Sequence, residues 1–309
     1  MQALITDQVH QLLIDKLQAA GVKTIYLPNI NQKEVEAVIA DFDILVINSK
    51  INVDADFLAK SKNLKVIGRL GSGLEIIDLD EAHRKGVRVF NSPEGNRDAV
   101  AEHAIGMLLA LFNKLQDAHR DVIHFDWHRE DNRGEELGGK TVGLIGFGNT
   151  GQALAKKLSG FDVDVLYYDK YKTSKSPYAQ YADLEQIYSE VDILSIHLPL
   201  TDETKNFFNR DFINNMQKPF YLINTSRGKV LNQEYLLEGL LGEKVLGACI
   251  DVFENEQISS YSVKEKEQIA ALQATRKVLF STHVAGWTHQ SKLKLADILA
   301  QKILTAFDE

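Results

Sequence analysis

Short apolar runs alternate along the chain with longer segments in which apolar residues recur every three or four positions. The short runs are rich in β-branched residues and predict buried parallel strands at residues 3–5, 44–47, 66–67, 87–90, 142–145, 163–168, 193–196, 221–223, 245–250 and 278–280. The segments between them have the apolar spacing of helices. This alternation predicts an α/β protein with two doubly wound parallel-sheet domains.

A long helix is predicted from about Arg97 to Arg120. Its centre is apolar almost all round, so it must be buried on several sides. The chain is then polar and irregular over residues 113–139, where Trp127 is the one large apolar anchor. The long helix therefore predicts a link between domains that also packs against a second subunit.

A second α/β series begins at Lys140, and a final helix is predicted over about 289–307. Because that helix follows a completed series, we expect it to cross back onto the first domain. The expected domains are a discontinuous one, residues 1–96 and 288–309, and a continuous one, residues 97–287.

A glycine-rich turn joins a predicted strand to a predicted helix. Gly146 permits a tight turn, Gly148 lets the backbone approach a pyrophosphate, and Gly151 lets helix and strand pack closely. The phosphates would bind the N–H groups at the helix N-terminus. The turn therefore predicts a dinucleotide site formed by Gly146, Phe147, Gly148, Asn149, Thr150 and Gly151.

The next predicted strand ends at Asp169, close to the spacing of about 20 residues expected for a ribose-binding carboxylate. A carboxylate there accepts hydrogen bonds from the ribose and repels a 2′-phosphate, so we predict NAD over NADP. Lys170 and Lys172 are nearby cations that would tolerate a phosphate, and a turn residue at a strand end is the alternative interpretation of Asp169.

Three later loops carry candidate chemistry directly after predicted strands, where ligands bind in open α/β sheets. Arg227 offers a rigid fork of donors that matches a carboxylate and its neighbouring carbonyl. His283 is the natural proton carrier, and a carboxylate from the loop at residues 251–256 would stabilise its charged form. The alternatives are a surface ion pair for Arg227 and a structural role for His283. The other histidines, including His103 and His197, lack this context.

Composition narrows the class of protein. The formal net charge of −8 argues against nucleic acid or an anionic membrane as the main partner. The single cysteine, Cys249, excludes an intramolecular disulfide and lies in an apolar run typical of a buried residue. The N-terminus does not resemble a signal peptide and no apolar run approaches roughly 20 residues, so we expect a cytoplasmic protein.

Several motifs occur in order along nearly the whole chain. They lie at residues 71–73, 86–93, 100–103, 146–151, 197–201, 224–228, 247–253 and 283–286. Together they resemble the D-isomer-specific 2-hydroxyacid dehydrogenase family, and within it the phosphoglycerate dehydrogenase-like members. The resemblance implies a Rossmann-type NAD domain, a flavodoxin-like discontinuous substrate domain, and a homodimer formed through the helix near 97–120.

The resemblance also assigns roles to residues. It implies that Arg227, Glu256 and His283 are catalytic, with Glu254 as the less favoured carboxylate, and that Arg227 and His283 contact substrate. It implies that the cofactor is NAD and that the substrate carboxylate binds N–H groups of a short loop. The residues implied to bind the cofactor are His197, Pro199, Thr204, Thr225, Asp251 and Gly286, and those implied to bind the carboxylate are Gly71, Ser72 and Gly73.

The substrate implied by the resemblance is a small 2-hydroxy or 2-keto acid, with or without a phosphate. Phosphoglycerate-type members often carry an arginine beside a serine after an early strand, whereas here the residues are Asn48, Ser49 and Lys50. Lys50 and Arg69 are candidates to replace that charge. No metal site is predicted.

A D-3-phosphoglycerate dehydrogenase-like enzyme is therefore the first functional hypothesis. A glyoxylate or hydroxypyruvate reductase is the alternative among enzymes, and a formate dehydrogenase is disfavoured because such relatives pair the histidine with glutamine. An NAD-sensing, corepressor-like binding protein is the alternative from another class.

Overall fold

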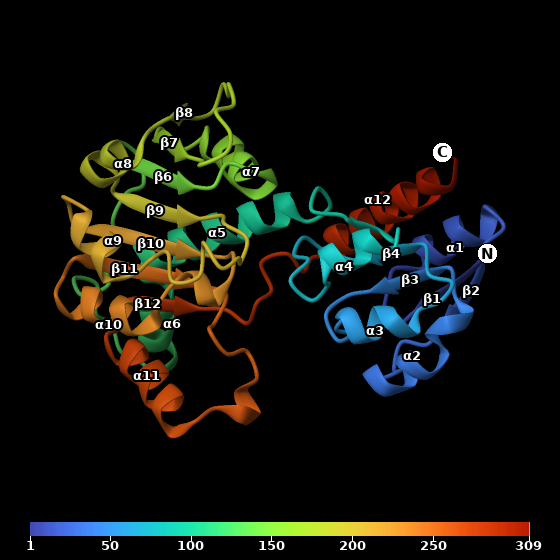
Figure 1. Cartoon of the computed structure of the whole chain (residues 1–309). Coiled ribbons are helices and arrows are strands. Elements are labelled where there is room, and N and C mark those ends of the chain that lie inside the picture. The colour runs from blue at the N-terminus through green and yellow to red at the C-terminus, as the bar shows by residue number, and fades with distance from the viewer. Residues whose placement is uncertain (309) are drawn as a thin grey trace. The chain divides into compact units, whose positions relative to one another are not determined.

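The computed structural model describes residues 1–308, which divide into two compact units. The first unit consists of Met1–Arg97 and the described residues from Trp287 onward, and the second of Asp98–Gly286. Each unit is built around its own parallel sheet (Figure 1). The limits expected from the sequence lie within one residue of these.

The first unit is built on five parallel strands in the order β2-β1-β3-β4-β5. The strands are β1 (Gln2–Ile5), β2 (Lys23–Tyr26), β3 (Ile44–Ile47), β4 (Val66–Arg69) and β5 (Arg88–Asn91). The helices are α1 (Gln11–Ala19), α2 (Gln32–Val38), η1 (Ile39–Asp41), α3 (Ala55–Lys60), α4 (Leu79–Arg84) and α12 (His289–Asp308). The central β3 is buried at all four positions, which explains its unbroken apolar sequence.

The helix α12 completes the core of this unit by packing against α1, β4 and β5. Gly68 on β4 makes the approach possible, because a Cβ there would lie 2.8 Å from the Cδ1 atom of Ile303. The last helix of the chain therefore belongs to the unit that the N-terminal residues begin.

The second unit contains seven parallel strands in the order β12-β11-β10-β9-β6-β7-β8. They are β6 (Thr141–Ile145), β7 (Asp164–Tyr168), β8 (Gln180–Tyr181), β9 (Ile193–Ile196), β10 (Phe220–Asn224), β11 (Val245–Ile250) and β12 (Val278–Phe280). The chain runs outward from β6 to β8, then returns to place β9 on the other side of β6. This reversal creates a switch point between β6 and β9, the place where open α/β sheets bind ligands.

Helices cover both faces of this sheet (Figure 1). They are α5 (Arg97–Phe112), α6 (Leu115–Ile123), α7 (Asn149–Leu158), α8 (Leu184–Glu190), α9 (Arg210–Asn215), η2 (Gly228–Val230), α10 (Gln233–Leu241), η3 (Ile258–Ser260) and α11 (Val263–Ala274). Buried residues of α5 and α7 pack on one face, and those of α8, α9, α10 and α11 on the other. No helix among the described residues is both long and apolar enough to cross a bilayer. These facts confirm the predicted fold class.

The prediction of one continuous helix over residues 97–120 is wrong. The helix α5 ends at Phe112, and Lys114 takes a left-handed backbone conformation (φ 47°) before α6 begins. The Phe112 carbonyl accepts a hydrogen bond from the Glu135 N–H at 3.1 Å. The end of α5 is therefore satisfied by a distant segment rather than by a further helical turn.

Candidate active site

The glycine turn between β6 and α7 packs against the loop that follows β9. Gly146 has a left-handed backbone (φ 94°), and a Cβ on it would lie 2.6 Å from the His197 carbonyl oxygen. A Cβ on Gly151 would lie 2.4 Å from the Gly146 carbonyl oxygen, so both positions require glycine. Gly148 has open space around it and precedes α7 without a side-chain cap. The first N–H groups of α7 therefore fit a pyrophosphate.

The carboxylate of Asp169 is fixed at the end of β7 by backbone donors. Its Oδ2 atom accepts a hydrogen bond from the Phe147 N–H at 2.8 Å. Its Oδ1 atom accepts from the N–H groups of Tyr171 at 3.0 Å and Lys172 at 3.1 Å. Since a carboxylate has about four acceptor positions, capacity remains for a ribose hydroxyl beside the glycine turn.

The residues implied to line the nicotinamide half of NAD follow β9 and β10. The His197 Nε2 atom lies 3.0 Å from the Ser195 Oγ atom, and burial lowers the pKa of His197 to about 4, so its ring is neutral near pH 7. The Thr204 hydroxyl donates to the Pro199 carbonyl at 2.6 Å. Among the described residues the buried Thr225 Oγ1 atom has no hydrogen-bond partner. A bound group would satisfy that hydroxyl, which fits a cofactor at this edge.

The structure brings His283 and Glu256 together, although 27 positions separate them in the chain. The His283 Nδ1 atom lies 2.8 Å from the Glu256 Oε2 atom. Burial by itself raises the pKa of Glu256, but the hydrogen bond and charge of His283, the Phe253 N–H and the charge of Arg227 hold it below the usual value. Glu256 is therefore a carboxylate near neutral pH and orients the ring, which leaves Nε2 for proton exchange.

Arg227 approaches this pair because the loops after β10 and β11 touch. A Cβ on Gly228 would lie only 1.9 Å from the Phe253 carbonyl, so glycine alone permits the contact. The Asn224 side chain donates to the Arg227 carbonyl at 3.1 Å, and the Arg227 Nη1 atom donates to the Ser226 carbonyl at 2.7 Å. The second unit thus positions a guanidinium, a carboxylate and an imidazole on neighbouring strand ends.

Asp251 holds the loop that carries His283. Its side chain is fully buried, and its backbone carbonyl accepts a hydrogen bond from the His283 N–H at 2.7 Å. Its carboxylate accepts hydrogen bonds from the Ser281 hydroxyl (2.6 Å) and the N–H groups of Val284 (2.9 Å) and Ala285 (3.0 Å). In this structure Asp251 therefore secures the His283 loop, a role that sequence reasoning missed.

His103 on α5 is the second residue whose position the sequence did not indicate. Its Nε2 atom lies 3.0 Å from the Ser281 hydroxyl and 3.7 Å from the Asp251 carboxylate. The sequence criterion was a position directly after a strand, and His103 lies on a helix. Its place in the motif at 100–103 was the only sequence feature that distinguished it from the other histidines without that context. Gly286 ends the same loop as the last residue of the second unit.

The residues implied to bind the substrate carboxylate follow β4 in the first unit. Gly71 has φ 139°, and Gly71, Ser72 and Gly73 form a turn that neighbouring side chains hold. The Asn91 side-chain amide donates to the Ser72 backbone carbonyl at 2.6 Å, and the Ser72 hydroxyl donates to the side-chain Oδ1 atom of Asn96 at 3.0 Å. The turn is therefore braced within its own unit.

The candidate phosphate-binding residues Asn48, Ser49 and Lys50 follow β3 in the same unit. The Lys50 Nζ atom donates to the Pro28 carbonyl at 2.7 Å. Its amine thus has a local partner in this structure.

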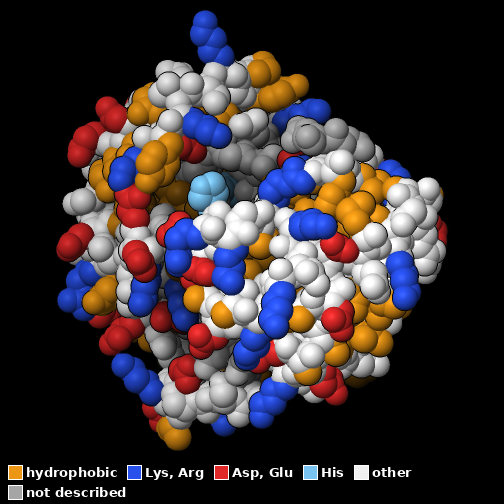
Figure 2. All heavy atoms as spheres, turned by 45° about the vertical axis from the view of Figure 1, so that its right-hand side comes forward, with side chains coloured by type: hydrophobic (Ala, Val, Ile, Leu, Met, Phe, Trp, Pro, Cys, Tyr) orange, Lys and Arg blue, Asp and Glu red, His pale blue; other side chains and the backbone are white. Residues whose placement is uncertain are grey.

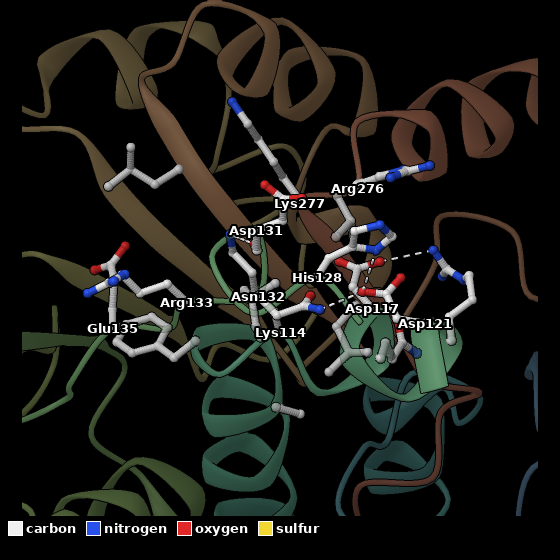
Figure 3. Close-up of a pocket in the computed structure, with 18 of the residues that line it drawn as sticks. Lys114, Asp117, Asp121, His128, Asp131, Asn132, Arg133, Glu135, Arg276 and Lys277 are labelled. Atoms are coloured by element: carbon white, nitrogen blue, oxygen red, sulfur yellow. Dashed lines mark hydrogen bonds and ion pairs between the residues drawn. The ribbon is translucent and has the colours of Figure 1, made fainter. Parts of the chain in front are cut away.

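A separate hollow of about 750 Å³ lies between α5, α6 and β12 in the second unit (Figure 3). The His128 Nδ1 atom lies 3.4 Å from the Asp121 carboxylate, to which Asn132 donates at 2.6 Å. Arg227, Glu256 and His283 do not line this hollow. Charged residues of both signs do, among them Lys114, Asp117, Asp121, Arg133, Arg276 and Lys277.

The same region exposes large apolar side chains. No residue of α6 is buried, and Phe125 and Trp127, which follow it, are 98% and 77% exposed. The prediction that Trp127 anchors its segment within the chain is therefore wrong.

On the face shown in Figure 2, positive and negative side chains are interspersed, as expected for a chain of modest net charge.

Comparison with known proteins identifies the family. Residues 105–285 match the model of the NAD-binding domain of D-isomer-specific 2-hydroxyacid dehydrogenases. A hydroxypyruvate reductase from Thermotoga maritima is 34% identical over 89% of this chain and 88% of its own length. A D-3-phosphoglycerate dehydrogenase from Archaeoglobus fulgidus is 29% identical over 98% of this chain, which spans only 57% of that relative.

Solved structures agree with the sequence comparison. The D-lactate dehydrogenase of Aquifex aeolicus, in complex with NAD and lactic acid, is 27% identical with a TM-score of 0.85 over 99% of this chain and 95% of its own. The chain therefore belongs to the D-isomer-specific 2-hydroxyacid dehydrogenase family, whose members are NAD-dependent oxidoreductases of 2-hydroxy acids.

Proposed function

We propose that this protein interconverts a D-2-hydroxy acid and its 2-keto acid, with His283 as the acid and base. The observation that carries the proposal is the 2.8 Å hydrogen bond between His283 Nδ1 and Glu256 Oε2. Arg227 lies close enough for its charge to lower the pKa of Glu256. An imidazole, a carboxylate and a guanidinium gathered at strand ends are the groups this chemistry needs.

NAD supplies the hydride acceptor when it is bound. In the oxidation direction, the Nε2 atom of neutral His283 takes the hydroxyl proton of the substrate while the carbon–oxygen bond becomes a carbonyl. Glu256 stabilises the resulting imidazolium, and Arg227 binds the substrate carboxylate through its paired donors. In the reduction direction, His283 returns the proton to the keto oxygen.

Among substrates, we favour a small unphosphorylated keto acid such as hydroxypyruvate or glyoxylate. The Lys50 amine, which the sequence offered for a phosphate, donates instead to the Pro28 carbonyl at 2.7 Å. A phosphorylated 3-carbon acid, the first hypothesis from the sequence, is the second candidate. The position of Arg69 supports this second candidate. Its guanidinium lies against Gly71, one of the residues implied to bind the substrate carboxylate, since a Cβ on Gly71 would lie 1.5 Å from Arg69 Nη1.

Oxidation of NADH in the presence of a panel of keto acids tests the reaction and the substrate together. The panel comprises hydroxypyruvate, glyoxylate, phosphohydroxypyruvate and pyruvate. We expect the largest kcat/KM with hydroxypyruvate or glyoxylate. A larger value with phosphohydroxypyruvate would select the phosphorylated substrate. No turnover with any member, despite NADH binding, would favour an NAD-sensing binding protein over an enzyme.

We further propose that the protein forms a homodimer through α6 and the segment that follows it. The support is the set of exposed apolar side chains there, together with the hollow whose walls carry both positive and negative groups (Figure 3). A surface with both charges and apolar residues is suited to a second copy of itself, because each sign finds its complement across a two-fold axis.

A further inference from the structure

We propose that Glu203 determines cofactor specificity: by neutralising Lys170, it makes the site prefer NAD to NADP. The proposal concerns cofactor binding alone and does not depend on which acid is the substrate. Glu203 lies in the loop after β9, outside the glycine turn and outside the segment that carries Asp169.

The contact joins two loops that follow strands on either side of β6. The Lys170 Nζ atom donates a hydrogen bond to the Glu203 Oε1 atom and forms an ion pair with it. The Tyr171 hydroxyl donates to the Glu203 Oε2 atom at 2.6 Å. Both carboxylate oxygens of Glu203 are therefore engaged by the segment that follows β7, which fixes the direction of the Lys170 side chain.

That same segment holds the ribose-binding carboxylate. The Tyr171 N–H donates to Asp169 at 3.0 Å, while its hydroxyl reaches Glu203. Tyr171 thus contacts two acidic side chains, Asp169 through its N–H and Glu203 through its hydroxyl. Any group bound next to Asp169 will experience the charges of Lys170 and Glu203 together rather than that of Lys170 alone.

The charge beside Asp169 determines how tightly the site binds a 2′-phosphate. In dinucleotide sites a nearby cation accommodates the 2′-phosphate of NADP, and Lys170 directly follows Asp169. With Glu203 attached, the cation is cancelled and its amine already has an acceptor. A 2′-phosphate would then meet the carboxylates of Asp169 and Glu203, and the amine of Lys170 would already be paired with Glu203.

Both partners are partly exposed, with side-chain exposures of 57% for Lys170 and 47% for Glu203. An exposed ion pair contributes little to folding stability. Removal of Glu203 should therefore leave the fold intact, while the net charge seen by a phosphate changes by one unit. Because such charges are screened, the effect should be largest at low ionic strength.

The test is to measure the Kd of NADH and of NADPH by nicotinamide fluorescence, without substrate, for wild type and Glu203→Gln. We expect the Glu203→Gln protein to bind NADPH more tightly relative to NADH by about fivefold, the size of one surface charge interaction. The gain should shrink when salt is raised. Glu238→Gln is the matched control, since Glu238 is 46% exposed, is paired with Arg210 and lies on α10.

Two double variants assign the effect to a lysine. In Glu203→Gln/Lys170→Ala we expect the gain for NADPH to disappear, whereas Glu203→Gln/Lys172→Ala should retain it. An unchanged NADPH-to-NADH ratio in Glu203→Gln would overturn the proposal. So would an equal gain in Glu238→Gln, or a gain that survives removal of Lys170.

Discussion

His283 occupies a backbone conformation that most side chains avoid, with φ 55°. For a residue other than glycine this left-handed region costs on the order of 1 kcal/mol, so neighbouring contacts must hold it. Asp251 supplies them through its carbonyl, which accepts from His283, and its carboxylate, which accepts from Val284 and Ala285. We interpret Asp251 as a positioning residue that keeps His283 beside Glu256.

Removal of one donor to Asp251 should therefore affect turnover more than cofactor binding. We expect Ser281→Ala to lower kcat by about tenfold, because it removes a charge-assisted hydrogen bond of about 1.5–3 kcal/mol to Asp251. The Kd for NADH should change by less than about twofold. Steady-state kinetics and NADH fluorescence titration measure the two quantities.

The matched control is Ser61→Ala, which removes a buried hydroxyl bonded to the Leu58 carbonyl in the first unit. The control should keep wild-type kcat. Asp251→Asn should be more severe than Ser281→Ala, since its amide would turn a donor toward backbone donors. If Ser281→Ala keeps full kcat, Asp251 does not act through this loop.

Residue types and strand ends were enough to select Arg227 and His283, since each follows a predicted strand. They were not enough for His103 or Glu203. His103 meets Ser281 across 178 positions, and Glu203 meets Lys170 across 33. Each contact depends on how a loop or helix packs, and no local pattern carries that information.

At the scale of elements, an apolar run decides which strands can be predicted. β3 and β9 are buried at every position, so their apolar runs stand out in the sequence. β2 and β8 are outer strands of their sheets, and neither contains a buried residue. Both were missed because neither contains an unbroken apolar run. The outer strands β5 and β12 also lack buried residues, but the apolar runs at residues 87–90 and 278–280 predicted them.

The helix α6 is amphipathic in sequence, yet it buries none of its residues within the chain. An apolar helix face of this kind needs a partner. We therefore expect the wild-type protein to have twice the chain mass of 34.7 kDa in solution, and Phe125→Asp to shift it toward the mass of one chain. Light scattering after gel filtration measures the mass directly.

Leu241→Asp is the control for that substitution, because Leu241 is 70% exposed and lies on α10. It should leave the mass unchanged. A wild-type protein with the mass of a single chain would contradict the dimer.

For the whole molecule, the sequence was sufficient to predict two parallel-sheet units, because alternating strands and helices leave few topologies. The strand order that creates the switch point beside the glycine turn came from the structure. The sequence did not predict the break between α5 and α6. There the Phe112 carbonyl accepts a hydrogen bond from the Glu135 N–H, which belongs to a distant segment. The grouping of the proposed catalytic side chains follows from the strand order, because β10, β11 and β12 are neighbours whose following loops meet at one edge.

We propose that His283 carries the proton in the reaction. The most direct measurement is kcat for His283→Asn with NADH and the best keto acid of the panel, together with the Kd for NADH. Asparagine tolerates the left-handed backbone of this position, so the loop should be retained. We predict a fall in kcat of roughly 10²–10⁴-fold with NADH binding within about twofold of wild type. A kcat close to that of wild type would exclude His283 as the proton carrier.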